Sequence, residues 1–80
     1  MKTIAYTSAS RRQLRSLAAD VRVRIESKLA RYSEMGAGDV THMQGSPGAR
    51  LRVGDFRVIF VETDTTIEVR AVGHRREIYR

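Results

Sequence analysis

Arginine side chains along the C-terminal third of the chain are spaced so that they can share one surface. The residues from 50 to 80 read RLRVGDFRVIFVETDTTIEVRAVGHRREIYR. Residues 53–56, Val-Gly-Asp-Phe, are typical of two strands joined by a two-residue turn. In that register Arg52 lies opposite Arg57. Because side chains alternate between the two faces of a strand, we expect both to lie on the same face as Arg50.

Two arginines placed directly opposite each other repel, so this arrangement opposes folding. Such a conflict is expected where function overrides local stability. The planar guanidinium group matches the oxygens of a phosphate and stays charged at any relevant pH. It can also stabilise the extra negative charge of a pentacovalent phosphorus transition state. The pattern therefore predicts an anion, and most simply a phosphodiester, on the arginine face.

A second turn at residues 64–65 predicts a further antiparallel strand, with Phe60 opposite Val69 and Val58 opposite Ala71. Alternation then puts Ala71 on the apolar face of the sheet. The arginine face would gain Arg70, Val72 and His74. In this arrangement Arg50, Ile59 and Arg70 form one row across three strands, so Arg70 is expected to hold nucleic-acid backbone together with Arg50 and Arg52.

The N-terminal half supplies the elements that would cover the apolar face. Residues 1–7 alternate as a strand, and Ser8 or Ser10 is expected to cap the helix that follows. Two apolar stripes are compatible with a helical hairpin or with one long kinked helix, since no Gly or Pro marks a joint. We favour the hairpin, which buries more of both stripes, with Asp20 as a cap for the second helix and Gly36 ending it. The stripes comprise Leu14, Leu17, Ala18 and Val21, then Val21, Ile25, Leu29 and Tyr32. Residues 37–49 are expected to form a loop.

These elements predict one α+β domain over residues 1–80, with the order β-α-α-β-β-β. A helical hairpin would pack on one face of a small antiparallel sheet, in two layers, and leave the arginine face open. Eighty residues are enough for one small core. Because the chain contains no cysteine, disulfide bonds cannot contribute to its stability.

The charge balance favours a polyanionic partner. Fifteen basic and nine acidic residues give a net charge of +6, which points to nucleic acid first, then to an anionic membrane or an acidic protein. The alternative is a solvated, arginine-rich surface. The longest apolar run, at residues 58–61, is far too short to span a membrane. With no signal peptide visible, we expect a cytoplasmic protein that uses no membrane.

Several catalytic signatures are missing from the sequence. It has no P-loop, no dinucleotide-binding glycine motif, and no cluster of histidines or cysteines spaced as metal ligands. We therefore expect neither a metal nor another cofactor. His42 lies in the predicted loop, where a lone histidine is usually a surface residue.

The remaining candidates for chemistry lie near the C-terminus. Arg75 follows the last predicted strand, and Tyr79 is the penultimate residue. A tyrosine can stack on an unpaired base or exchange a proton, although it can also simply cover the edge of the sheet. His74 is a second candidate for proton transfer, or a residue of the sheet face with no such role.

The residues of RLRVGDFRVIF and GHRREIY resemble the RelE branch of the RelE/ParE toxin superfamily, and the predicted order of elements matches that family over the whole chain. The resemblance implies a toxin of a type II toxin–antitoxin system that cleaves mRNA on the ribosome, without a metal, by attack of the ribose 2′-hydroxyl on the adjacent phosphate. It implies catalytic roles for Arg57, Arg75 and Tyr79, and RNA contacts for Arg50 and Arg52. The implied partners are mRNA, the ribosome and a cognate antitoxin, which would form a hetero-oligomer with the toxin.

The chain departs from the family at the first hairpin strand, where the best-known members carry lysines. Arg50 and Arg52 cannot give up a proton there, although they can bind phosphate. The short spacing between Arg75 and Tyr79 also weakens the assignment of the tyrosine. Two alternatives stay open. One is a ParE-like toxin that inhibits DNA gyrase, and the other is a non-enzymatic basic module that binds RNA or an acidic partner.

Overall fold

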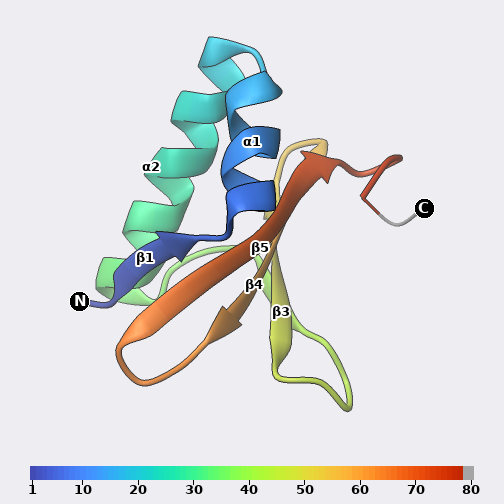
Figure 1. The fold of residues 1–80 in the computed structure, drawn as a ribbon. Helices are drawn as coiled ribbons and strands as arrows, with labels where there is room; N and C mark the ends of the chain where they lie inside the picture. Colours follow the sequence, from blue (N-terminus) through green and yellow to red (C-terminus); the bar gives the residue numbers. More distant parts are fainter. Residues whose placement is uncertain (79–80) are drawn as a thin grey trace.

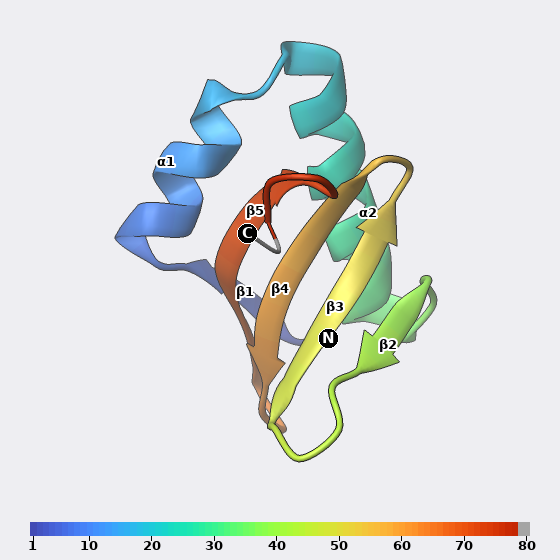
Figure 2. The ribbon, with the colours of Figure 1, turned by 90° about the vertical axis from the view of Figure 1, so that its right-hand side faces the viewer.

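The computed structural model describes residues 1–78. Over these residues the chain forms two helices and one five-stranded sheet with the strand order β1-β5-β4-β3-β2. The elements are β1 (Thr3–Tyr6), α1 (Ser8–Ser16), α2 (Ala19–Met35), β2 (Val40–His42), β3 (Gly48–Val53), β4 (Phe56–Glu62) and β5 (Thr66–His74). Both helices lie on the same side of the sheet (Figure 1). The other side, the open face, has no helix of residues 1–78 over it, and the turn that follows β5 lies across part of it (Figure 2). The predicted two-layer α+β fold is confirmed.

Two features of the sheet differ from the prediction. The sheet is mixed, because β1 runs parallel to β5 while the other neighbours are antiparallel. A short additional strand, β2, lies within residues 37–49, where we expected a loop, and it pairs with β3 at the edge of the sheet. Three residues are too few for their alternation of apolar and polar side chains to predict a strand within a glycine-containing segment.

The helical hairpin forms as predicted, with details of capping that differ. Thr7 rather than Ser8 or Ser10 caps α1, since its side chain accepts a hydrogen bond from the Ser10 amide. The buried Ser10 hydroxyl instead donates to the carbonyl oxygen of Val69 at 2.7 Å and so ties α1 to β5. No side chain caps the start of α2, where Asp20 lies in the first turn. Gly36 ends α2 in the left-handed conformation, as expected.

One hydrophobic core lies between the helices and the sheet. The strands contribute the inward-facing residues of the two hairpins, and the helices contribute one stripe each. The buried members are Leu14, Ile25, Leu29, Ala49, Leu51, Val53, Val58, Phe60, Ile67, Val69 and Val72. Phe60 is completely buried, and its ring centroid lies 5.5 Å from that of Tyr32 on α2. Burial of these side chains is the main favourable contribution to folding.

A polar network closes one edge of this core. Glu62 at the end of β4 accepts a hydrogen bond from the Tyr32 hydroxyl at 2.7 Å and one from the Lys2 ammonium at 2.6 Å. Burial alone would raise the pKa of Glu62, but these two bonds and the nearby positive charges hold it below its usual value. Burial, together with the hydrogen bond to Glu62 and its negative charge, raises the pKa of Tyr32 to about 12.

Candidate anion-binding cleft

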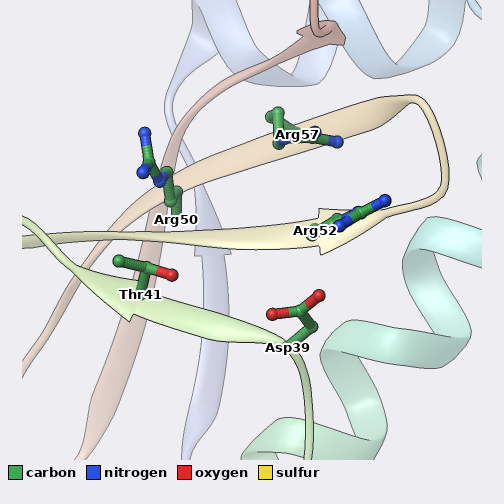
Figure 3. Close-up of a pocket in the computed structure, with 5 residues that line it drawn as sticks. All are labelled: Asp39, Thr41, Arg50, Arg52 and Arg57. Atoms are coloured by element: carbon green, nitrogen blue, oxygen red, sulfur yellow. The ribbon is translucent and has the colours of Figure 1, made fainter.

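A cleft of about 270 Å³ opens on the face of the sheet opposite the helices. Its walls come from three adjacent strands at the β2 side of the sheet (Figure 3). The residues that line it are Asp39, Thr41, Arg50, Arg52 and Arg57. A space of this size suits a phosphate group and part of a sugar better than a large organic ligand. Three guanidinium groups around it give the cleft a strongly positive character.

The strand register explains why the three arginines meet. Arg52 pairs with Arg57 across β3 and β4, and Arg50 pairs with Ile59. Both pairings agree with the prediction from the hairpin turn. Leu51 and Val58, which alternate with these arginines, point into the core and are fully buried. The core therefore fixes which face the arginines occupy, since a slip of one residue would bring them into the apolar layer.

Backbone hydrogen bonds fix the position of the Arg57 side chain. Its Nη1 group donates hydrogen bonds to the carbonyl oxygens of Gly54 at 2.8 Å and of Phe56 at 2.9 Å. These bonds hold the guanidinium against the hairpin turn. Because a guanidinium group has five N–H donors in a planar fork, the side chain can be held at one end while it presents other donors to an anion. On the β5 side, Arg57 pairs with Gly73, and the side chain of Ile78 lies against this glycine.

The strand β2 adds two residues to the cleft that the sequence analysis missed. Thr41 pairs with Arg50, and the Arg52 amide donates to the carbonyl oxygen of Asp39 at 2.9 Å. The pairing therefore continues to Asp39, which together with Thr41 lies on the arginine side of the sheet (Figure 3). The β-branched residues of Val40-Thr41 were a signal for a strand, but nothing in the sequence indicated its partner.

A β-bulge in β5 overturns part of the predicted arginine face. Phe60 pairs with Val69 as predicted, but Ile59 pairs with Ala71, so Arg70 is the additional residue on β5. Beyond the bulge the alternation is reversed. Val72 is buried in the core, and the prediction that Ala71 faces inward was wrong. The predicted row of Arg50, Ile59 and Arg70 does not form. Arg70 is exposed and its Nε donates to Glu68 at 2.8 Å.

His74 is likewise on a different side from the one predicted. It pairs with Phe56 and shares the side of Val72, the helix side of the sheet. The rings of His74 and Phe56 meet edge to face with centroids 5.5 Å apart. His74 lines a separate hollow of about 510 Å³ between α1 and the end of β5, and it is not among the residues that line the arginine cleft. A proton-transfer role in the cleft has no geometric support at this position.

Arg75 lies just past β5 and contacts the first hairpin turn. Its amide donates to the carbonyl oxygen of Asp55 at 2.8 Å, and its Nε lies 3.7 Å from the Asp55 carboxylate. Arg75 is thus near the turn that follows Arg52 but does not line the cleft. Its role in phosphate binding stays a prediction. Tyr79 lies outside the described residues, so its predicted role is also still a prediction.

Residues 1–78 contain no group of three or more histidine, aspartate or glutamate side chains that could hold a metal ion. Neither of the two helices described is long and apolar enough to cross a membrane.

Residues 2–79 match the family model described as the ParE toxin of the type II toxin–antitoxin system parDE. The chain belongs to this family. It is therefore a toxin of the type II toxin–antitoxin class, within the RelE/ParE superfamily that the two hairpins resembled. No curated protein sequence matches the chain significantly.

Solved structures of related toxins have the same fold. A chain of the RelB–RelE antitoxin–toxin complex from Methanococcus jannaschii matches with a TM-score of 0.78 and 22% identity over 94% of each chain. The archaeal RelE–RelB complex from Pyrococcus horikoshii OT3 gives a TM-score of 0.79 and 20% identity over 95% of this chain and 97% of that one. The isolated E. coli RelE toxin gives a TM-score of 0.76 and 19% identity over 99% of this chain and 92% of that one.

Proposed function

We propose that this toxin inhibits translation by cleaving mRNA on the ribosome, and that the arginine cleft holds the scissile phosphate. The observation that carries the proposal is the gathering of Arg50, Arg52 and Arg57 around one phosphate-sized space. The Arg52–Arg57 pair costs stability when the cleft is empty, and a bound phosphate would offset this repulsion. Added negative charge in the transition state would be stabilised more strongly still.

The fold supports a protein partner that silences this activity. Several of the structures with the same fold are antitoxin–toxin complexes. We propose a cognate antitoxin whose binding segment is acidic, because the chain carries a net charge of +6 and an exposed arginine cleft. The toxin and its antitoxin would form a hetero-oligomer in the cytoplasm, where the ribosome and mRNA are found.

Inhibition of DNA gyrase is a second candidate, because the matching family model is that of the ParE toxin. The RelE/ParE superfamily contains both kinds of toxin, and a ParE-like protein would need no nuclease site. A cationic cleft would then serve to bind an acidic surface or DNA backbone. The two functions differ in their first observable effect, since one breaks mRNA and the other changes DNA supercoiling.

Expression of the chain in bacteria, with mRNA 5′ ends mapped and plasmid supercoiling measured in the same cells, separates the two. We expect new mRNA ends within translated regions and unchanged supercoiling. Substitution of Arg57 by Ala should reduce the amount of new mRNA 5′ ends by about 10²–10³-fold while the protein stays folded. Intact mRNA with altered supercoiling would establish the gyrase function instead. A loss of only a few-fold, restored at low salt, would indicate a module that binds RNA without cleaving it.

A further inference from the structure

Cleavage of RNA by its own 2′-hydroxyl group requires a group that accepts the hydroxyl proton. The arginines of the cleft cannot do so, because a guanidinium group stays protonated in proteins. His74 lies on the helix side of the sheet, away from the cleft. Among the five residues that line the cleft, Asp39 is the one that carries a carboxyl group, whose oxygens can accept a proton.

The structure fixes where this carboxylate lies. Asp39 precedes β2, and the bond from the Arg52 amide to its carbonyl oxygen holds its backbone against β3. Its side chain rises toward β3, so that Arg52 lies between Asp39 and Arg57 (Figure 3). A phosphate held by Arg52 and Arg57 would therefore have the carboxylate on its β2 side. The Thr41 hydroxyl on the same strand can hold the ribose.

The carboxylate is available as an acceptor. The ion pairs found within residues 1–78 join acidic residues to Lys2, Arg70 and Arg75, and none of them includes Asp39. Asp39 is also exposed, so a proton that it accepts can pass to water. If the Asp39 carboxylate served only to neutralise the arginines of the cleft, we would expect it to form a short ion pair with one of them.

We propose that Asp39 is the general base of this toxin, a role that rests on the proposed cleavage of RNA. One of its carboxylate oxygens takes the proton from the 2′-hydroxyl as the 2′-oxygen forms a bond to phosphorus. The phosphorus–O5′ bond breaks, its electron pair leaves with the 5′-oxygen, and that oxygen takes a proton from solvent. The products are a 2′,3′-cyclic phosphate and a 5′-hydroxyl end, and Asp39 returns its proton to water.

The test compares Asp39→Asn with the wild-type toxin in single-turnover cleavage of ribosome-bound mRNA. The amide keeps the size of the side chain but cannot accept the proton, so we expect the cleavage rate to fall by about 10²–10⁴-fold. Asp39→Glu should recover part of this loss. Asp64→Asn is the matched control, because it makes the same change in an exposed turn between β4 and β5 and should cleave at the wild-type rate.

Two further measurements separate the chemistry from binding and folding. Binding of an mRNA with a 2′-deoxy nucleotide at the cleavage site should be as tight for Asp39→Asn as for the wild type. A substrate with sulfur in place of the 5′-oxygen needs no acid, so the defect of Asp39→Asn should persist on it. Rescue by this substrate, or wild-type cleavage by Asp39→Asn, would overturn the assignment of Asp39 alone. If the wild-type toxin leaves mRNA intact, the proposed function itself fails.

Discussion

The two faces of the sheet are made by the same strands and have opposite properties. On the helix side, Leu51 and Val58 are fully buried in a continuous apolar layer. On the open face, their neighbours Arg52 and Arg57 lie opposite each other, and neither of the described helices covers them. The apolar face therefore stabilises the fold through burial, and the open face destabilises it through repulsion between like charges. The comparison teaches that stability and function are separated residue by residue along one hairpin.

The largest effect should come from the covered face. Replacement of Phe60 by Ala removes a completely buried ring that packs against Tyr32. We expect the free energy of unfolding to fall by about 3–5 kcal/mol, which would unfold most of such a small domain. Urea denaturation followed by circular dichroism measures the change. A loss below about 1 kcal/mol would show that the core does not carry the stability of the fold.

A smaller effect, on RNA cleavage, should follow from replacing a guanidinium group on the open face by an ammonium group. Arg57→Lys keeps the positive charge but loses the fork that can hold two phosphate oxygens at once. We expect RNA cleavage to fall by about tenfold, less than for Arg57→Ala, with the denaturation midpoint unchanged. Kinetics of cleavage and urea denaturation of the same samples test this. Equal activity of the Lys variant and the wild type would mean that charge alone matters at this position.

The polar network at the edge of the core should make stability depend on pH. Since the pKa of Glu62 is lowered in the folded protein, its contribution is present above the usual value of 4.5 and is lost as the pH falls through the lower folded value. Glu62→Gln should reduce stability by about 1 kcal/mol at pH 7, because the side chain is partly exposed. Denaturation at a series of pH values from 7 down through the acidic range should show the variant approaching the wild type below the usual value of 4.5. A constant difference would contradict the lowered pKa.

The smallest effect should be a gain in stability from the open face. Arg52→Ala removes the cross-strand repulsion with Arg57, so we expect the free energy of unfolding to rise by about 0.5 kcal/mol at low salt. The gain should shrink as added salt screens the two charges. Denaturation at low and high ionic strength measures it. Destabilisation by this substitution would mean that Arg52 contributes to folding rather than opposing it.

Local alternation in the sequence predicted the first hairpin correctly, because its two-residue turn and the buried residues of β3 and β4 fix one register. The second hairpin was predicted only up to Val69. The bulge at Arg70 reverses which side the following residues of β5 face. The one sign of it in the sequence was the pair of adjacent apolar residues Ala71-Val72, which breaks the alternation of apolar and polar residues. The predicted side of His74 and the predicted cross-strand row of Arg70 were consequently wrong.

The contribution of β2 to the cleft could not be predicted from the sequence. Asp39 and Thr41 reach the site only because a three-residue strand pairs with β3 at the edge of the sheet. Such pairing depends on contacts across a glycine-containing loop rather than on local pattern. The arginines of a cleft can thus be found from alternation, whereas a carboxylate that completes it requires the fold.

The central claim is that the arginine cleft binds nucleic-acid backbone, and the salt dependence of RNA binding tests it most directly. The variant with Ala at positions 50, 52 and 57 is compared with one that loses three exposed helix arginines, Arg12, Arg15 and Arg31. Both lose the same charge. For single-stranded RNA, the slope of log K against log salt should fall by about 2 for the cleft variant and hardly change for the helix variant. Equal slopes for the two variants would contradict the account.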